Sequence, residues 1–522
     1  MKFSELSNTA NFTAKLPGDP SDSISPRQVH SACFSHVQPE VPSSPELLHY
    51  SKKLASDLGF EVNNLDVFLR TMAGAKNIPN ASPYAMCYGG HQFGHWAGQL
   101  GDGRAINIAE LELQNQQWIF QLKGSGPTPY SRTADGFAVL RSSIREYLCS
   151  EAMCALGVPT TRALALVKTG DLVTRDMLYN GNPQDEQGAV VCRVSNSFIR
   201  FGSFEIFTAR NDTKNLKTLV DFTIEQHYPH LGAPSKEAYL EFFREVSQRS
   251  KDMVVHWQRI GFVHGVMNTD NMSILGQTID YGPYGWLEDY NPEWTPNTTD
   301  AQHRRYRFGN QPKIVLWNLL QLANALYPLI EDATLLEDIL EEHRQTYATS
   351  YHSMMLCKLG LRDTNALPSL ITNLTTLMEK TSIDMTIFFR ELSNFVSKDF
   401  SEFWKIILKS SYLKDEGIQQ LELKKHWETW MNNFCSAIVK ENWDSTERLN
   451  SMKLTNPKYV LRNYMAQMAI EEAEKGNYKV IDELYHLLLN PYSEQVEMEK
   501  WYAKRPQWAE NKIGCSMLSC SS

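Results

Sequence analysis

The stretch His264-Gly-Val-Met-Asn-Thr-Asp270-Asn271-Met-Ser-Ile-Leu275, followed by Thr278-Ile-Asp280-Tyr-Gly282, decides how this 522-residue chain is interpreted. It gathers the side-chain oxygens of Asp270, Asn271 and Asp280, which are donors that hard cations prefer. A nucleoside triphosphate needs backbone amides around its phosphates, cations against its charge, and carboxylate or amide oxygens around Mg²⁺. The stretch can supply the last of these.

The same stretch partly matches the motifs of protein kinases, H-R-D-x-x-x-x-N followed by D-F-G. When His264 is aligned with the kinase histidine, Asn271 and Asp280-Tyr-Gly282 keep the metal-binding positions. Val266 stands where the catalytic aspartate should be, and a new carboxylate, Asp270, directly precedes the asparagine. The pattern predicts a triphosphate site whose base has moved, and a chemistry other than ordinary kinase transfer.

Upstream residues could supply the cations and the phosphate loop. Lys123 ends an expected strand and Glu146 lies within an expected helix, so they could form the ion pair by which kinases hold a lysine against phosphates, although Glu146 could also be simply solvated. Gly101-Asp-Gly103-Arg104 precedes the strands and could cover phosphates, or merely connect elements.

Two arginines and one turn complete the candidate set. Arg193 and Arg200 lie seven residues apart on strand-like chain, where arginines are usually surface residues. Their planar forks could also clamp a terminal phosphate. Asp135-Gly136 is interpreted either as a turn or as the entry to the following helix.

One histidine pair and one cysteine pair are candidates for metal or redox sites. His91 and His95 have a paired-ligand spacing, but the glycines around them and the missing third ligand argue against zinc. Cys515 and Cys520 near the C-terminus are too few for structural zinc, yet an exposed pair in a tail is redox-competent.

Composition is that of an ordinary soluble protein, with 42% hydrophobic residues, 21% charged residues and a net charge of -9. The acidic balance argues against a nucleic-acid partner, because such partners need clustered cations. No apolar window approaches the roughly 18 residues of a membrane span, and no signal peptide is recognisable. Nine scattered cysteines fit a reducing compartment, so we expect a cytoplasmic location. We also expect a monomer.

The order of the expected elements predicts an α+β, bilobal protein-kinase-like fold, with a mixed α/β front lobe and a large helical back lobe. We expect an N-terminal arm and helix over 1–60, a front lobe over 61–210, a helical back lobe with the catalytic loop over 211–500, and a flexible redox tail over 501–522. The expected elements are a helix over 46–58, strands over 105–113 and 118–123, a helix over 138–156, strand and loop over 190–207, a helix over 236–260, a short strand over 272–275, and helices from 312 to 499.

Long runs of the chain resemble the selenoprotein O family of protein adenylyltransferase pseudokinases. One run is Tyr88-Gly-Gly-His-Gln-Phe-Gly-His-Trp-Ala-Gly-Gln-Leu-Gly-Asp-Gly-Arg104. Others cover Gln121–Arg132, Val139–Glu146, Ile199–Glu205 and Asp270–Gly282. The resemblance extends from about residue 80 to the end of the chain.

The resemblance implies a kinase-like fold that binds ATP in a flipped orientation, so that AMP passes to a Ser, Thr or Tyr hydroxyl of a target protein and pyrophosphate leaves. It implies Mg²⁺ or Mn²⁺ on Asn271 and Asp280, the base at Asp270, and the selenocysteine position at Cys520. Lys123 is then paired with Glu146. The implied nucleotide contacts are Gly101, Gly103, Arg104, Lys123, Asp135, Gly136, Arg193, Arg200 and Asp280.

Two departures and two alternatives accompany this interpretation. The family usually has Gly-Asp-Gly-Arg where this chain has Ala134-Asp135-Gly136-Phe137, so one cation is lost, and the segment around His303 also differs. A small-molecule phosphotransferase of the aminoglycoside-kinase type, or UMP transfer from UTP, is the alternative activity. A catalytically dead scaffold is disfavoured, because Lys123, Glu146, Asn271 and Asp280 are all retained.

Overall fold

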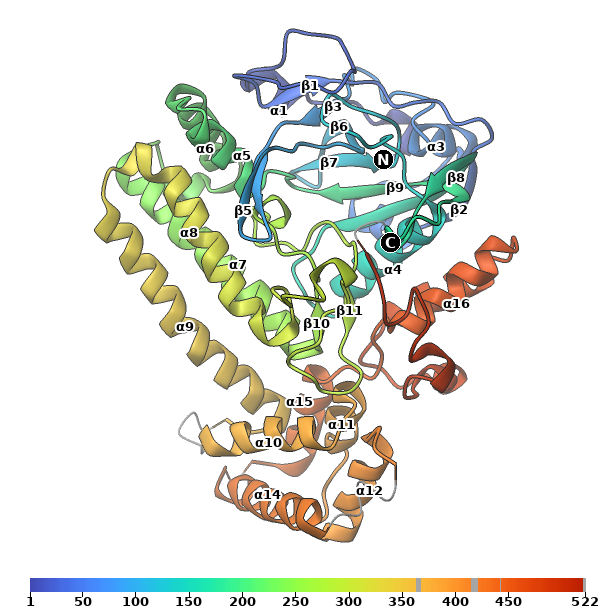
Figure 1. Cartoon of the computed structure of the whole chain (residues 1–522), viewed down its shortest axis with the longest axis vertical. Coiled ribbons are helices and arrows are strands. Elements are labelled where there is room, and N and C mark those ends of the chain that lie inside the picture. The colour runs from blue at the N-terminus through green and yellow to red at the C-terminus, as the bar shows by residue number, and fades with distance from the viewer. Residues whose placement is uncertain (363–367, 415–420, 442, 520–522) are drawn as a thin grey trace.

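The computed structural model describes residues 1–362, 368–414, 421–441 and 443–519. It combines a seven-stranded antiparallel sheet with many helices (Figure 1), which confirms the expected mixture of strands and helices. Across the sheet the strands run in the order β1 (Phe34–His36), β3 (Tyr84–Met86), β6 (Ala105–Leu113), β7 (Gln116–Lys123), β9 (Gln184–Ser195), β8 (Arg162–Arg175) and β2 (Glu46–Tyr50).

The β6–β7 hairpin places Lys123 beside the glycine turn. Gln114 and Asn115 connect the strands with φ values of 52° and 59°, and two consecutive positive φ values suit the right-handed twist of a tight hairpin. Lys123 then pairs with Ala105, the residue that follows Gly101–Arg104. Both expected strands are therefore confirmed, and their register brings the lysine to the start of β6.

Both faces of the sheet are covered. Helix α4 (Leu140–Ala155) packs on β8 and β9, and its other side meets α16 (Asn463–Glu474) and α17 (Lys479–Leu488). Helices α2 (Lys52–Asp57) and α3 (Leu65–Met72) cover the opposite face. Alternate residues of β9 join different clusters, because successive side chains of a strand point to opposite faces.

The first 60 residues contribute more to the sheet than expected. The predicted helix over 46–58 is wrong for its first five residues, because Glu46–Tyr50 pairs with β8 as strand β2. Ser51 then caps α2 through its side-chain oxygen, so the helix starts only after the strand ends. The expected arm also supplies η1 (Phe3–Glu5), α1 (Asn11–Lys15) and edge strand β1.

A second difference concerns residues 190–207, which were expected to be strand and loop. Strand β9 ends at Ser195, and Phe201–Ala209 forms helix α5. The run Phe201-Gly-Ser-Phe-Glu-Ile-Phe is buried along all of its length, so it lacks the polar face by which an amphipathic helix is recognised. The expected strand over 272–275 is limited to isolated bridges at Met272 and Ser273.

Helix α7 (Lys236–Ile260) precedes the motif stretch, residues 264–282. Ser235 caps its first turn, and Gly261 ends it with a φ of 73°, a left-handed conformation that glycine adopts readily. The motif stretch follows through β10 (Phe262–Val263), η3 (Thr269–Asn271) and β11 (Gly285–Trp286), with β10 and β11 paired. The prediction of this helix is confirmed at both ends.

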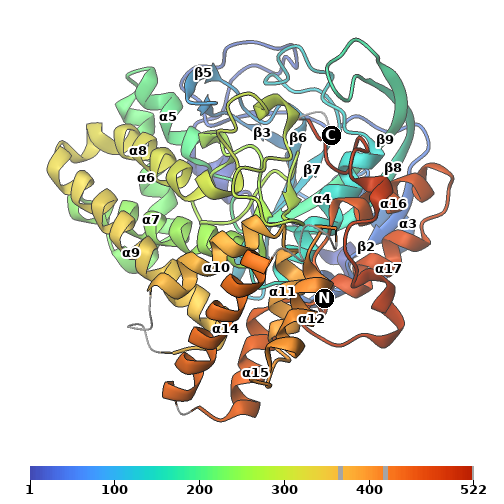
Figure 2. The same cartoon turned by 60° about the horizontal axis from the view of Figure 1, so that its bottom comes forward.

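Helices α10, α11, α12, α14 and α15 form the lower part of the molecule in Figure 1, and Figure 2 brings them forward. Helices α8 and α9 pack along α7. Helices α10, α11, α12, α14 and α15 surround a separate hydrophobic core that is rich in aromatic residues. This confirms helices through most of 312–499. Their bounds are α6 (Thr213–His227), η2 (Pro229–Leu231), η4 (Thr298–Asp300), η5 (Phe308–Asn310), α8 (Gln311–Ile330), α9 (Ala333–Leu359), α10 (Pro368–Lys380), α11 (Met385–Leu392), α12 (Phe400–Ser410), α14 (Leu421–Glu441) and α15 (Ser445–Thr455).

The end of the chain departs from the expected flexible tail over its described part, residues 501–519. Trp501, Cys515 and Leu518 are buried, and two short turns, η6 (Val496–Trp501) and η7 (Gln507–Ala509), lead into this segment. Thr298 N donates to Leu518 O at 2.7 Å. Apolar burial and backbone pairing thus hold the segment against the rest of the protein. Separately, none of the helices in the described ranges is long and apolar enough to cross a bilayer.

Candidate nucleotide-binding cleft

A cleft of about 670 Å³ opens between the sheet and the motif stretch. Glu146 lies behind its wall, Cys515 lies elsewhere, and Cys520 falls outside the described residues. The cleft is lined by every other residue that the sequence singled out as a nucleotide, metal or base candidate: Gly101, Gly103, Arg104, Lys123, Asp135, Gly136, Arg193, Arg200, Asp270, Asn271 and Asp280.

A buried ion-pair network forms one wall. Lys123 Nζ lies 2.6 Å from a Glu146 carboxylate oxygen, so the predicted contact between strand and helix is present. Arg193 Nη1 reaches the other carboxylate oxygen at 3.1 Å, and its Nε donates to Gln121 at 3.0 Å. Since all of these side chains are buried, each charge depends on its partner for compensation.

Asp280 stands at the meeting point of three cations. Arg193 and Arg200 each donate to its carboxylate, and Lys123 Nζ lies 3.5 Å away. Burial alone would raise the pKa of Asp280, but the charges of these three side chains outweigh it and hold the pKa well below its usual range. Its φ of 56° is left-handed, a conformation that aspartate tolerates better than most residues.

Asp270 has the opposite environment. It lies in the one-turn helix η3 and is 8% exposed. Burial raises the pKa of its carboxyl to about 7, although a hydrogen bond from Gln92 and the charge of Arg200 oppose the rise. Asn271, the next residue, donates its amide to Val266 O at 2.8 Å, which leaves its side-chain oxygen available to a cation.

Glycines let the backbone close around the cleft. At Gly101, with a φ of 84°, an added Cβ would lie 2.4 Å from the Tyr130 ring, and at Gly103 it would lie 2.8 Å from Tyr130 O. At Gly136, with a φ of 82°, it would lie 2.3 Å from Pro127 N. A side chain at any of these positions would push the turns apart. The glycines therefore keep two backbone loops in contact beside the residues that are candidates for binding phosphate.

This chain has Phe137 where the family pattern has a cation, and an arginine on another strand supplies a cation nearby. Arg175, at the end of β8, makes a two-pronged salt bridge to Asp135 with distances of 2.6 and 2.7 Å, and its Nη2 also donates to Phe137 O at 2.9 Å. A cation is therefore present beside Asp135, although it comes from a distant part of the sequence. The chain pattern around Arg175 carried no signal for this contact.

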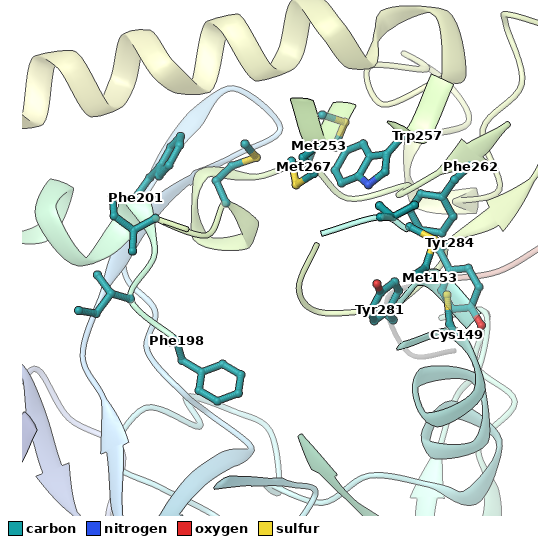
Figure 3. Packing of buried hydrophobic residues seen from close by; sticks show 14 of the residues in the cluster. Cys149, Met153, Phe198, Phe201, Met253, Trp257, Phe262, Met267, Tyr281 and Tyr284 are labelled. Atoms are coloured by element: carbon teal, nitrogen blue, oxygen red, sulfur yellow. The ribbon is translucent and has the colours of Figure 1, made fainter. Parts of the chain in front are cut away.

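Aromatic packing holds the motif stretch in place beneath the cleft (Figure 3). Tyr281 and Tyr284 are buried beside Cys149 and Met153 of α4. Arg145, also on α4, donates to Tyr284 O at 2.7 Å and lies over its ring. Both tyrosines are packing residues, and this packing ties the segment around Asp280 to the helix that carries Glu146.

The histidine pair does not form a metal site within the part of the chain that the structure describes. His91 Nδ1 lies 2.6 Å from Glu205, whereas His95 is exposed on the facing strand. The described residues contain no group of three or more His, Cys, Asp or Glu side chains arranged to hold a metal.

Sequence reasoning missed further cleft residues. Tyr88, Gln92 and Asp102 line the cleft within the run Tyr88–Arg104, and none of the three belongs to a functional motif of its own. Asp102 is buried, accepts from Tyr88 OH at 3.2 Å and lies 3.8 Å from Arg200. In the sequence, Asp102 is marked only by its position between Gly101 and Gly103. Spacing alone cannot distinguish a buried aspartate from one in an exposed turn.

The donors at the end of the cleft suit a hard divalent cation. Asn271 and Asp280 offer an amide oxygen and an ionised carboxylate, and Mg²⁺ typically takes one or two protein oxygens while phosphates and waters complete its shell. Two protein donors are also fewer than a dedicated protein cage requires. The residues therefore fit a cation that arrives with a polyphosphate.

Buried arginines, a strand lysine, glycine turns and paired oxygen donors together define a site of the class that holds a polyanion with a divalent cation. A model of the family described as Protein adenylyltransferase SelO matches residues 25–489. This match spans most of the chain, and the protein belongs to that family. The family expected from the sequence is thus confirmed.

Whole-length relatives agree with this assignment. The chain is 54% identical over 525 residues to a protein of Flavobacterium johnsoniae named Protein nucleotidyltransferase YdiU, and the match covers 100% of both chains. Proteins of the same name are 50% identical in Aromatoleum aromaticum, with 98% of each chain covered, and 48% identical in Rhodopirellula baltica, with 99% of each covered. Such coverage means that the relatives share the whole architecture.

Proposed function

We propose that this protein transfers AMP from ATP to Ser, Thr or Tyr hydroxyls of target proteins and releases pyrophosphate. The observation that carries the proposal is the exchange of roles in the motif stretch: Val266 lines the cleft where a kinase has its base, while the carboxylate of Asp270 lies beside the metal donors. Valine cannot accept a proton. Family membership and the relatives named protein nucleotidyltransferase support the same chemistry.

In the proposed reaction, the oxygen of a target hydroxyl attacks the α-phosphorus of ATP. A new oxygen–phosphorus bond forms, the bond from the α-phosphorus to the bridging oxygen breaks, and pyrophosphate leaves with that electron pair. Asp270 takes the hydroxyl proton, a task suited to a carboxyl whose pKa lies near neutrality.

The arginines have a separate task in this proposal. Arg193 and Arg200 now bond to Asp280, and their forks can turn to the oxygens of the departing pyrophosphate. In the flipped ATP orientation that the family resemblance implies, the β- and γ-phosphates lie on these arginines and the α-phosphate faces Asp270. Lys123, held by Glu146, adds a further cation to the same region.

Asn271 and Asp280 would hold the divalent cation, Mg²⁺ or Mn²⁺, which when bound neutralises charge on the phosphates. Asp280 remains ionised because three cations lower its pKa, so it is ready to bind such an ion. This donor set does not by itself favour one of the two metals.

The overall arrangement supports interpreting the protein as a bilobal, kinase-like enzyme. The sheet with α4 forms the proposed front lobe, and α7, α8 and the later helices form the proposed back lobe (Figure 1). Residues of both proposed lobes line the cleft. We keep the proposed lobes at 61–210 and 211–500, while β1 and β2 extend the front-lobe sheet into the first 60 residues. A cytoplasmic monomer without nucleic-acid or membrane partners remains part of the proposal.

Labelled nucleotides test the proposed reaction. The purified full-length protein is incubated with Mg²⁺ or Mn²⁺ and a protein mixture, using ATP labelled with ³²P at either the α- or the γ-position. We expect label from the α-position to enter protein and label from the γ-position not to enter. Strong incorporation of γ-label would overturn the proposal in favour of phosphate transfer, and label on small molecules alone would favour the phosphotransferase alternative. The same assay with α-labelled UTP measures UMP transfer.

A further inference from the structure

The carboxylate of Asp270 is held by a single donor side chain. Gln92, the last residue of strand β4 (Gly89–Gln92), donates its amide to Asp270 Oδ2 at 3.2 Å. Within the described ranges no second side chain donates to this carboxylate, and Asp270 Oδ1 is buried without a hydrogen-bond partner. The orientation of the Asp270 carboxylate therefore depends on the hydrogen bond from Gln92 and on the residues packed around it.

The hairpin that carries Gln92 is docked on the turn that carries Asp270. It consists of β4 and β5 (His95–Gln99), and β5 projects away from the large sheet (Figure 1). His91 N donates to Thr269 Oγ1 at 2.7 Å, and Phe93 N donates to Asn268 at 3.2 Å. These bonds on either side of Gln92 fix its backbone relative to η3, so its amide has a defined reach.

Glycines allow the close approach between the hairpin, α5 and Asp270. A Cβ added at Gly90 would lie 2.9 Å from Asp270 Oδ1 and 3.0 Å from Asp270 Cβ. A Cβ added at Gly202, on α5, would lie 2.0 Å from Gly89 O. A hydrogen bond of 2.6 Å between His91 Nδ1 and Glu205 joins β4 to the same helix. Strand β4 is thus wedged between α5 and the carboxylate.

We infer that Gln92 is a positioning residue for nucleotidyl transfer, which aligns the Asp270 carboxylate with the incoming target hydroxyl. The inference rests on the proposed function, in which Asp270 receives the proton of that hydroxyl. An amide cannot take this proton itself, so Gln92 acts through Asp270. Its contribution belongs to the activation of the acceptor and not to the binding of the nucleotide.

Steady-state kinetics of Gln92→Leu in the full-length protein provide the first test. Removal of the side-chain donor that the described residues provide should lower kcat by roughly 10- to 100-fold, the range expected for a hydrogen bond to a charged group, and should leave KM for ATP within about 2-fold. His95→Ala is the matched control, because His95 pairs with Gln92 across the hairpin but is exposed, and it should retain wild-type kinetics. An unchanged kcat, or a raised KM alone, would overturn the inference.

A double-mutant cycle separates positioning from general damage to the fold. In the Asp270→Ala background, Gln92→Leu should have no further effect on the residual transfer rate, because the group on which it acts is absent. An equal loss in both backgrounds would show that Gln92 does not act through Asp270. Thermal unfolding and binding of a fluorescent ATP analogue verify that each variant folds.

Gly90→Ala is a second, independent variant. Its methyl group would crowd the Asp270 carboxylate while Gln92 remains, so kcat should fall in the wild-type background. An unchanged kcat would contradict the inference, because the rate would then not depend on how the carboxylate is aligned. The two possible failures are distinguishable: absence of AMP transfer by the wild-type protein rejects the proposed function, whereas normal transfer that is insensitive to Gln92→Leu rejects only the positioning role.

Discussion

The turn that carries Asp270 and the segment that carries Asp280 line the same cleft, yet they surround their carboxylates in opposite ways. Asp280 faces Lys123, Arg193 and Arg200, and its pKa is held well below the usual range. Asp270 has one neutral donor, Gln92, and burial raises its pKa to about 7. In the proposed reaction, two groups of the same type therefore have two roles: Asp280 stays charged and binds the cation, and Asp270 exchanges a proton.

The largest effect on transfer is expected for Asp280, the aspartate that faces three cations. Asp280→Asn keeps the shape of the side chain but removes the charge that faces three cations, so transfer should fall by roughly 10³-fold or more. EDTA should abolish wild-type transfer as well. Measured by α-³²P incorporation, near-normal activity of Asp280→Asn would break the distinction between the two aspartates. Asp252→Asn, at an exposed aspartate of α7, is the control.

A somewhat smaller effect is expected for the other aspartate. Asp270→Ala should lower turnover by roughly 10²- to 10⁴-fold, the usual range for loss of a general base, while nucleotide affinity stays measurable. Turnover is measured by label transfer, and affinity by titration with a fluorescent ATP analogue. If this variant kept full turnover, Asp270 would be only a turn residue and the comparison would lose its catalytic meaning.

The arginines that hold Asp280 should tolerate even a charge-preserving change poorly. Arg193→Lys and Arg200→Lys should each reduce transfer by about 10-fold, because an ammonium group cannot reproduce two parallel hydrogen bonds. Arg344→Lys on α9 is the control, since Arg344 makes a two-pronged bond to Glu341 at 2.6 and 2.8 Å on the surface, away from the cleft. Wild-type rates in both cleft variants would show that neither fork is needed.

The smallest effects concern the C-terminal cysteines. Burial raises the pKa of the Cys515 thiol to about 11, so its thiolate is scarce near neutral pH and alkylation by iodoacetamide should be slower than at exposed Cys357. Mass spectrometry of the modified peptides measures both rates. Rapid modification of Cys515 would show that the segment 501–519 opens readily, contrary to its packing.

Cys520 keeps its predicted redox role as a proposal. We expect it to form a reversible disulfide that changes activity modestly, by about 2- to 5-fold, and non-reducing mass spectrometry with transfer assays in both redox states tests this. The buried Cys515 can serve as partner only if the two Cα atoms come within about 7 Å. A Cys520→Ser variant that matches wild type under oxidising and reducing conditions would remove the proposed function of the tail.

Local patterns in the sequence determined many elements and nearly all candidate residues of the cleft. The periodic, capped segment 236–260 and the hairpin residues 105–123 follow rules that act over a few neighbours, and the structure agrees with them closely. The motif stretch identified Asp270, Asn271 and Asp280 because their chemistry and spacing are specific. These features depend on short-range backbone geometry, which neighbouring residues in the sequence determine.

Only the tertiary structure decided which of these residues meet, and what each environment does to them. Gln92 contacts Asp270 across 178 residues, and Arg175 reaches Asp135 from another hairpin. The strand at 46–50 depends on pairing with β8, and the packed C-terminal segment depends on distant apolar partners. Burial and charge pairing are sums over the whole fold, so no local pattern could show that one aspartate remains ionised while the other titrates near neutrality.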